Sequence, residues 1–169
     1  GGADQMARTI GRLAEKNFPL ILVGRRNNEV EKLKNKLPSG ENIVFTTNLE
    51  PVRMARIVVT ATSDPRAIIG SSHLGPEAVV YEISQPRNVK QSALTERPDV
   101  VVIDGAYVDI GDINLKFNMG PPRGATFACL AETIMGALEG DVGHHVGEID
   151  TEYLKRTADW AKKYGFKHA

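Results

Sequence analysis

The sequence of 169 residues contains a single cysteine, Cys129. One thiol excludes an internal disulfide framework and is typical of a reducing cytoplasm. Charge of one sign is not in excess either, because 21 lysines and arginines balance 21 aspartates and glutamates. We therefore expect no nucleic acid as a partner. No apolar run is long enough to cross a bilayer, and no signal peptide is visible, so the sequence predicts a cytoplasmic globular protein.

Short apolar runs alternate with segments of helical periodicity over much of the chain. Strands are predicted at residues 19–23, 43–45, 56–60, 78–83 and 99–104. This alternation predicts an α/β fold, a Rossmann-like doubly wound parallel sheet that binds ligands at the carboxyl ends of its strands. No strand pattern precedes the first helix, so we expect the sheet to lack its first strand in this chain. The unpaired edge could promote self-association into a homo-oligomer.

Helical periodicity predicts helices at residues 4–17, 28–37, 127–138 and 150–164. The pattern changes after Gly111, where residues 113–117 alternate like one more strand. We expect one NAD(P)-binding domain over residues 1–169. It would consist of a nucleotide-binding core at residues 1–112 and a helical tail at residues 113–169, which carries the Cys129 helix and packs on that core.

The first residues fit a relaxed form of the dinucleotide-binding motif G-x-G-x-x-G. Asp4 and Ala7 stand where the second and third glycines would be, and Asp4 adds bulk and charge beside a phosphate. The candidate cofactor-binding residues in this motif are Gly2, Ala3, Asp4, Gln5 and Met6. A helix capped by Asp4 explains the same residues, so both interpretations stay open.

Two further strand ends carry candidate cofactor contacts. Arg25 and Arg26 follow the strand at residues 19–23, where an NAD site usually has an acidic residue. A guanidinium fork suits a 2′-phosphate instead, which favours NADP, although arginines at a loop start are more often only solvated. Thr60, Ala61 and Thr62 offer small side chains where a nicotinamide could lie, or they form a plain junction between a strand and a turn.

Cys129 lies near the predicted start of a helix, after a loop rich in proline and glycine. With Thr126 as the cap, the helix dipole and nearby Arg123 would favour the nucleophilic thiolate. Glu132, one turn on, could orient a water molecule or the substrate, or only stabilise the helix. Burial is the competing interpretation, since a cysteine between alanine and leucine is more often a core residue.

Two other pairs of polar residues are weaker candidates for a metal site or for acid–base catalysis. His144 and His145 are adjacent in a loop and lack a helix-spaced partner, so we expect no metal site. Asp109 and Asp112 could pair as acid and base, but aspartates in turns usually bond to their own backbone. From the residues alone, Cys129 could be either a reactive thiol or a core residue.

From Val79 to the C-terminus the sequence resembles the NADPH-dependent long-chain acyl-(acyl carrier protein) reductases of the cyanobacterial type. The shared stretches are residues 101–106, 112–113, 127–132 and 163–167, of which residues 127–132 read Phe-Ala-Cys-Leu-Ala-Glu. The resemblance implies that Cys129 accepts the acyl group and that NADPH is the cofactor. It also implies an acyl carrier protein or coenzyme A thioester as partner, and a separate amino-terminal part for the substrate. Peripheral contact with a membrane stays open.

Residues 2–7, 61–65 and 85–89 also resemble the nucleotide domains of glutamyl-tRNA reductases and shikimate dehydrogenase-like proteins. Those families lack the Phe-Ala-Cys block, so we place them second. The first prediction is thus an oxidoreductase that uses NADPH to reduce a fatty acyl thioester to an aldehyde through an acyl-cysteine intermediate. The alternative is an NADP-dependent domain of the glutamyl-tRNA reductase or shikimate dehydrogenase type, or a non-catalytic nucleotide-binding module.

Overall fold

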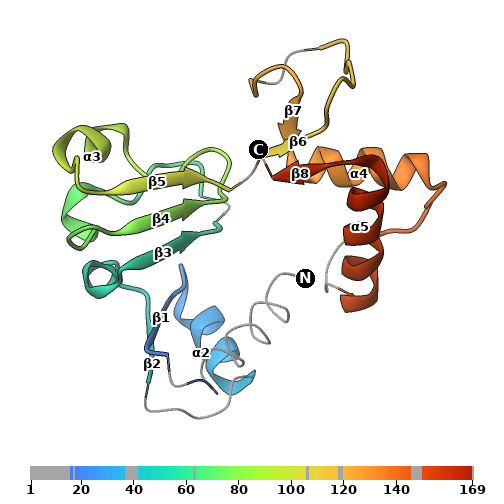
Figure 1. The fold of residues 1–169 in the computed structure, drawn as a ribbon. Coiled ribbons are helices and arrows are strands. Elements are labelled where there is room, and N and C mark those ends of the chain that lie inside the picture. Colours follow the sequence, from blue (N-terminus) through green and yellow to red (C-terminus); the bar gives the residue numbers. More distant parts are fainter. Residues whose placement is uncertain are drawn as a thin grey trace. The chain divides into compact units, whose positions relative to one another are not determined.

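The computed structural model describes residues 16, 18–36, 42–62, 64–105, 107–117, 120–145 and 150–168. The chain forms two compact units, residues 1–103 (unit 1) and residues 104–169 (unit 2). The predicted α/β fold is confirmed, with parallel strands in unit 1 and C-terminal helices in unit 2 (Figure 1). The helix predicted at residues 4–17 lies outside the described residues. The division into a core and a packed tail stays a prediction.

The first sheet of unit 1 consists of two parallel strands. β1 (Leu20–Val23) pairs with β2 (Ile43–Thr46). α2 (Asn27–Lys36) connects them and packs Leu33 against Ile43. The turn between β1 and α2 requires Gly24, because a Cβ there would lie 2.5 Å from Cγ2 of Val30. The residues that follow Gly24 therefore stand directly at the carboxyl end of β1.

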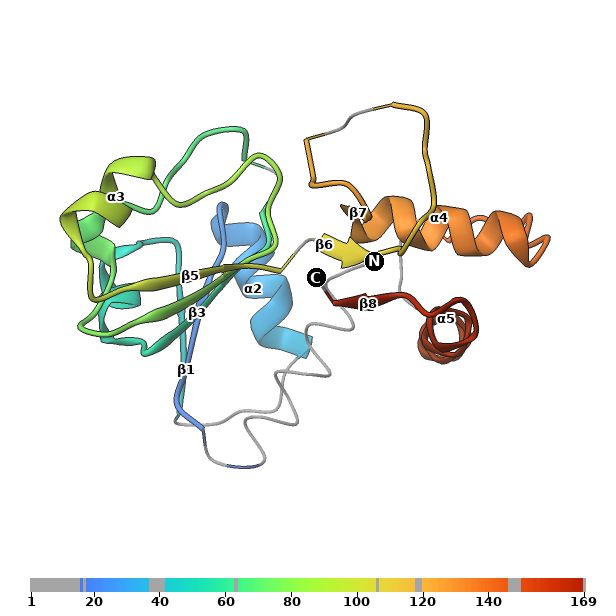
Figure 2. The same cartoon turned by 45° about the horizontal axis from the view of Figure 1, so that its top comes forward.

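The second sheet of unit 1 has the strand order β3-β4-β5. β3 (Ile57–Thr60) and β4 (Val79–Glu82) are parallel, and β5 (Val101–Asp104) lies beside β4. The connections contain the 3₁₀ helices η1 (Glu50–Met54) and η2 (Ser71–His73) and the helix α3 (Gln91–Glu96). Figure 2 shows α3 next to β5. Each predicted strand of unit 1 is confirmed to within two residues at its ends.

One face of the β3-β4-β5 sheet forms the core of unit 1. Side chains alternate along each strand, so Val58, Thr60, Val80 and Glu82 all turn to the buried face. The opposite face carries exposed apolar side chains, namely Ile57, Val59, Tyr81, Ile83, Val101 and Ile103. The buried face therefore contains two polar residues, Thr60 and Glu82, at the carboxyl ends of neighbouring strands.

Unit 2 contains an antiparallel sheet that the sequence pattern does not predict. Its order is β7-β6-β8, with β6 (Tyr107–Asp109) between β7 (Ala125–Phe127) and β8 (Lys167–His168). The strand predicted at residues 113–117 is wrong, because these residues form bends and coil. The physical reason is local: Asn114 Oδ1 accepts from the backbone N–H of Lys116 at 2.9 Å, and Lys116 has a positive φ of 63°.

Two helices pack on this sheet, α4 (Ala128–Leu138) and α5 (Thr151–Tyr164), and they cross steeply (Figures 1 and 2). Their core contains Ile110, Ala131, Met135 and Phe166. On α5, Tyr153 is buried, Trp160 and Ala161 are half-buried, and Leu154 is exposed. Asp150 caps α5, and Gly165 ends it in a left-handed conformation with φ 72°.

Glu139 ties the end of α4 to the end of α5. Its Oε1 accepts from Lys163 Nζ at 2.6 Å and from the Tyr164 hydroxyl at 2.7 Å. These hydrogen bonds, the one from Lys163 first, lower the pKa of Glu139 below its ordinary value. A carboxylate with a lowered folded-state pKa stabilises the protein fully above the pKa of a free glutamate. That contribution is lost as the pH falls through the folded-state pKa.

We expect Glu139→Gln to lower the urea midpoint near pH 7 and to have a much smaller effect at a pH below the folded-state pKa of Glu139, where the wild-type carboxyl group is also neutral. Urea unfolding of both proteins at the two pH values measures the difference. Glu31→Gln is the matched control, since Glu31 is exposed on α2 and lies 4.0 Å from Lys34. An equal loss for Glu139→Gln at both pH values would contradict the assigned role of the carboxylate.

Candidate functional site

A buried carboxylate lies at the carboxyl ends of β3 and β4. Glu82 is 0% exposed, and its Oε1 accepts a hydrogen bond from the hydroxyl of Thr60. Its Oε2 accepts from the backbone N–H groups of Asn88 at 3.0 Å and Val89 at 2.9 Å. Because both oxygens are occupied by buried donors, Glu82 fixes the segment after β4 to the end of β3.

Asn88 extends these contacts to the segment after β3. Its buried side chain accepts from the Thr62 hydroxyl at 2.6 Å and donates to the carbonyl oxygens of Asp64 at 3.2 Å and Arg66 at 3.3 Å. The Ser84 hydroxyl accepts from the Thr62 N–H at 2.9 Å. Hydrogen bonds thus join the loop after β3 to the loop after β4. We call the polar residues of this junction, Thr60, Thr62, Asp64, Glu82, Ser84 and Asn88, the edge network.

Asp64 holds an arginine at this edge. Its Oδ1 accepts from the backbone N–H and from Nε of Arg66, both at 3.0 Å, and its Oδ2 accepts from Nη2 at 2.9 Å. These hydrogen bonds hold the pKa of Asp64 well below its usual range, and the charge of Arg25 adds a smaller effect in the same direction. Arg25 follows β1 and Asp64 follows β3, so each stands near the carboxyl end of its own strand.

The two arginines predicted to meet a 2′-phosphate differ in their partners. Arg26 donates to Oε1 of Glu29 from Nε at 3.0 Å and from Nη2 at 2.5 Å. Arg25 is exposed, and its side chain has no hydrogen bond or ion pair with the residues that the structure describes. Among the described residues nothing competes with an anion for Arg25, whereas Arg26 would first have to leave Glu29.

The predicted cofactor residues Thr60, Ala61 and Thr62 stand at the carboxyl end of β3. Thr60 is buried and serves the edge network, while Ala61 and Thr62 are exposed directly after β3. The candidates Gly2, Ala3, Asp4, Gln5 and Met6 lie outside the described residues. The prediction missed Glu82, Asn88 and Arg66. A glutamate inside the apolar run 78–83 was the signal that could have identified the first of them.

Cys129 is the second residue of α4 and is exposed. Its exposure disagrees with the competing interpretation of a core cysteine. The predicted cap is wrong, because α4 begins at Ala128 with Phe127 at the cap position, and Thr126 belongs to β7, opposite Val108. Strand pairing with β6 outweighs the capping preference of threonine at this position. Arg123 is exposed before β7, and Glu132 is half-buried one turn after Cys129.

The Thr126 hydroxyl is buried and has no hydrogen-bond partner among the described residues. We expect Thr126→Val to keep the free energy of unfolding or raise it by up to about 1 kcal/mol, because the unpaired hydroxyl is removed and the shape is kept. Thr60→Val is the matched control and should lose about 1–2 kcal/mol, since its hydroxyl donates to Glu82. Urea unfolding measures the free energy of unfolding of both variants. A similar loss for Thr126→Val and Thr60→Val would contradict the claim that the Thr126 hydroxyl is unpaired and the Thr60 hydroxyl is hydrogen-bonded.

Glu132 and His145 both contact Tyr153 on α5. Burial and then a hydrogen bond to Glu132 raise the pKa of Tyr153. The Tyr153 ring stacks on His145 with the ring centroids 3.5 Å apart, and Nε2 of His145 lies 3.3 Å from Oδ2 of Asp141. These contacts fasten the loop before α5 to the helix. In the described ranges no group of three or more His, Cys, Asp or Glu could hold a metal ion.

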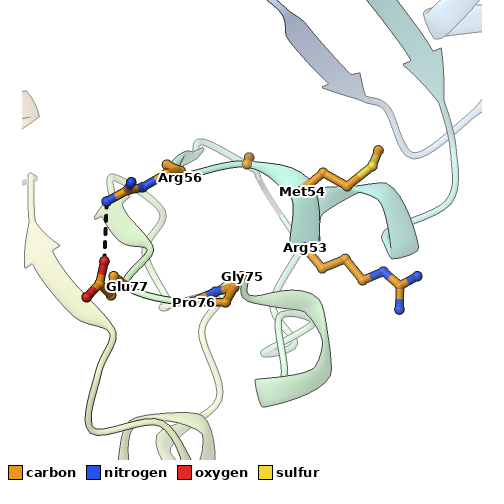
Figure 3. Close-up of a pocket in the computed structure, with 7 residues that line it drawn as sticks. Arg53, Met54, Arg56, Gly75, Pro76 and Glu77 are labelled. Carbon is orange, nitrogen blue, oxygen red and sulfur yellow. Dashed lines mark ion pairs between the residues drawn. The ribbon is translucent and has the colours of Figure 1, made fainter.

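A shallow hollow lies at the opposite ends of the same strands. Arg53, Met54 and Arg56 precede β3, and Gly75, Pro76 and Glu77 precede β4 (Figure 3). Arg56 and Glu77 form an exposed ion pair at 3.5 Å across it. A Cβ on Gly75 would lie 2.4 Å from the carbonyl oxygen of Arg53, so this glycine serves close backbone packing. The hollow is therefore at the amino ends of the strands, away from the edge network.

No helix in the part of the chain that the structure describes is both long enough and apolar enough to span a membrane.

Comparisons with known proteins relate the chain to a reductase. No family model matches it. Over 121 residues, 68% of the chain, it is 35% identical to the glutamyl-tRNA reductase of Methanocaldococcus jannaschii, of which the match covers 30%. Over 168 residues, 91% of the chain, it is 26% identical to the aminotransferase PigE of a Serratia species, of which the match covers 19%. The chain thus spans less than a third of either relative, and its similarity to a reductase extends over about two thirds of its own length.

Proposed function

We propose that this chain carries the dinucleotide-binding part of an NADP-dependent oxidoreductase. The observation that carries the proposal is the edge network, because it joins the loops after β3 and β4 where sheets of parallel strands bind ligands. The similarity to glutamyl-tRNA reductase supports a reductase. It favours the glutamyl-tRNA reductase-like alternative over the acyl-(acyl carrier protein) reductase as the closer relationship.

Features of the described residues support a phosphorylated dinucleotide as the ligand. Arg25 is exposed and unpaired with any described residue, so its guanidinium could bind the phosphate. Ala61 and Thr62 are small and exposed after β3, where a nicotinamide ring could lie. Glu82 and Asn88 would keep these loops in place. NADPH, when bound, would supply a hydride, and the chain's own residues would hold and orient it.

We further propose that Cys129 receives the acyl group of a thioester substrate, as an acyl carrier protein or coenzyme A would present it. This finer proposal is supported by the exposure of Cys129 in the first turn of α4. Its sulfur would bond to the acyl carbon, the bond from that carbon to the carrier sulfur would break, and the released thiolate would take up a proton. Backbone N–H groups of the first turn would stabilise the oxyanion.

A second candidate is a reductase domain whose reacting residues lie elsewhere in a longer protein. The match to only 30% of glutamyl-tRNA reductase favours this candidate. A non-catalytic nucleotide-binding module is the third. The acyl-cysteine reductase and the reductase domain with reacting residues elsewhere would both bind NADP. Only the first of these candidates predicts that Cys129 becomes acylated.

Titration of the chain with NADPH and NADH, followed by nicotinamide fluorescence, tests the nucleotide site. We expect tighter binding of NADPH and a loss of about tenfold or more in Arg25→Ala, because a charge-assisted contact to the phosphate is removed. Arg26→Ala is the matched control and should lose less, since Glu29 engages Arg26. Equal affinity for NADPH and NADH would refute the cofactor assignment. Unchanged NADPH affinity in a variant that carries both Arg25→Ala and Arg26→Ala would refute it as well.

A further inference from the structure

Arg66 presents an exposed guanidinium from the loop after β3. Of its side chain 77% is accessible, against 8% for its partner Asp64. An almost buried carboxylate that holds an exposed arginine differs from an ordinary surface ion pair, in which both side chains move freely. Here the buried carboxylate fixes the position of the guanidinium, and the guanidinium stays open to solvent.

Asp64 fixes the orientation of Arg66 at three points. It accepts from Nε at 3.0 Å, from Nη2 at 2.9 Å and from the backbone N–H of Arg66 at 3.0 Å. The Nη1 group of Arg66 has no hydrogen-bond partner among the residues that the structure describes. Two N–H donors of a preorganised guanidinium therefore stay available to an anion.

The buried side chain of Asn88 joins Arg66 to the end of β3. Its Oδ1 accepts from the Thr62 hydroxyl at 2.6 Å, and its Nδ2 donates to the carbonyl oxygen of Arg66 at 3.3 Å. Since both contacts are made by one amide group, the carbonyl of Arg66 lies near the hydroxyl of Thr62. The proposed nicotinamide position is at Ala61 and Thr62, so Arg66 belongs to the nicotinamide half of a bound dinucleotide.

The anionic group of NADPH nearest to the nicotinamide ring is the phosphate on the nicotinamide ribose. Only that ribose separates it from the ring, whereas the 2′-phosphate lies at the adenosine end. The predicted phosphate motif at the start of the chain has Asp4 in place of the second glycine, which normally lets the backbone approach the pyrophosphate. A cation on another loop would offset this negative charge, and a guanidinium fork suits phosphate oxygens.

We propose that Arg66 binds the pyrophosphate of the dinucleotide at the phosphate on the nicotinamide ribose. This assignment rests on the proposed nucleotide site and adds to it a binding residue on the β3 loop. Asp64 and Asn88 act as positioning residues, because they hold Arg66 and would not touch the phosphate. NADPH and NADH share this phosphate, so the contact strengthens the binding of both nucleotides and does not select between them.

Titration of the full chain with NADPH and with NADH, followed by nicotinamide fluorescence, tests the contact. We expect Arg66→Gln to weaken the binding of both nucleotides about tenfold or more and to leave the ratio of their affinities within about twofold. Calorimetric titration with 2′,5′-ADP, which lacks the phosphate on the nicotinamide ribose, should give an affinity within about twofold of the wild type.

Two controls separate a phosphate contact from a loss of loop structure. Arg53→Gln changes an exposed arginine at the amino end of β3 and should leave the binding of all three ligands unchanged. The wild-type affinity for NADH should fall more steeply between about 0.1 and 1 M NaCl than that of Arg66→Gln, because a charged contact is screened by salt. Glutamine can still donate to Asp64, and circular dichroism verifies that the variant is folded.

The outcomes separate this assignment from the proposed function. Unchanged affinity for NADPH and NADH in Arg66→Gln would overturn the role of Arg66 and leave the nucleotide site standing. A loss for NADPH alone, or an equal loss for 2′,5′-ADP, would overturn that role as well, because the effect would then not depend on the phosphate of the nicotinamide half. A wild-type chain that binds neither NADPH nor NADH would overturn the nucleotide site itself.

Discussion

Glu82→Ala is expected to lower the free energy of unfolding by about 3–5 kcal/mol. The substitution leaves the N–H groups of Asn88 and Val89 and the hydroxyl of Thr60 without their acceptor in a buried place. Each buried group left unpaired costs about 1–3 kcal/mol, partly offset by relaxation of the loop. Equilibrium unfolding in urea, followed by circular dichroism, measures the loss.

Two variants test whether the effect belongs to the hydrogen bonds. Glu82→Gln should lose only about 1–2 kcal/mol, because its oxygen can still accept from the two N–H groups and its amide can donate to the Thr60 hydroxyl. Glu31→Ala, on the exposed face of α2, should leave the free energy of unfolding nearly unchanged. A Glu82→Ala protein as stable as the wild type would mean that Glu82 does not hold the two loops together.

Cys129→Ser is expected to abolish acylation of the chain by a long-chain acyl-coenzyme A, a loss on the order of a thousandfold or more in the rate of adduct formation. The sequence contains no other cysteine, so the adduct has one thiol to occupy. Intact-protein mass spectrometry measures the added acyl mass, and release by neutral hydroxylamine distinguishes a thioester from an amide.

Thr126→Val is the matched control for acylation, because it changes a residue close to Cys129 in sequence and leaves the thiol in place. This variant should acylate like the wild type. An adduct that persists in Cys129→Ser would place the reaction on another side chain. The absence of any adduct, also in a longer protein with an amino-terminal substrate part, would sink the acyl-cysteine proposal and favour the second candidate.

The strands and helices that the sequence predicts well are those with a local pattern. The apolar runs that become β1 and β3 begin directly after Pro19 and Arg56, and Gly24 ends the first of them, so local residues locate these strands. The three strands of unit 2 have only two or three residues each, too few to show a period. Their existence depends on pairing between distant residues, such as Val108 with His168. No local pattern contains that information.

The residues of the candidate site also include some that a local pattern predicts and some that only the fold reveals. The carboxyl ends of the strands are predictable, so Arg25 and the Thr60 to Thr62 stretch could be named as candidates from the sequence. The partners are not predictable, because Asn88 reaches Thr62 and Asp64 only after β3 and β4 have paired. The prediction for Thr126 comes from local preference and is wrong. Its side chain favours a helix cap, but pairing with β6 places it in β7.

The central claim is that a phosphorylated dinucleotide binds at the carboxyl edge of unit 1, and mapping that site is its most direct test. Amide signals of the ¹⁵N-labelled chain would be followed by NMR while NADP is added. We expect the largest shifts on the non-proline residues of the ranges 24–26, 61–66 and 84–89. Absent shifts, or shifts centred on Arg53 to Arg56 and Gly75 to Glu77 at the opposite ends of the strands, would contradict it.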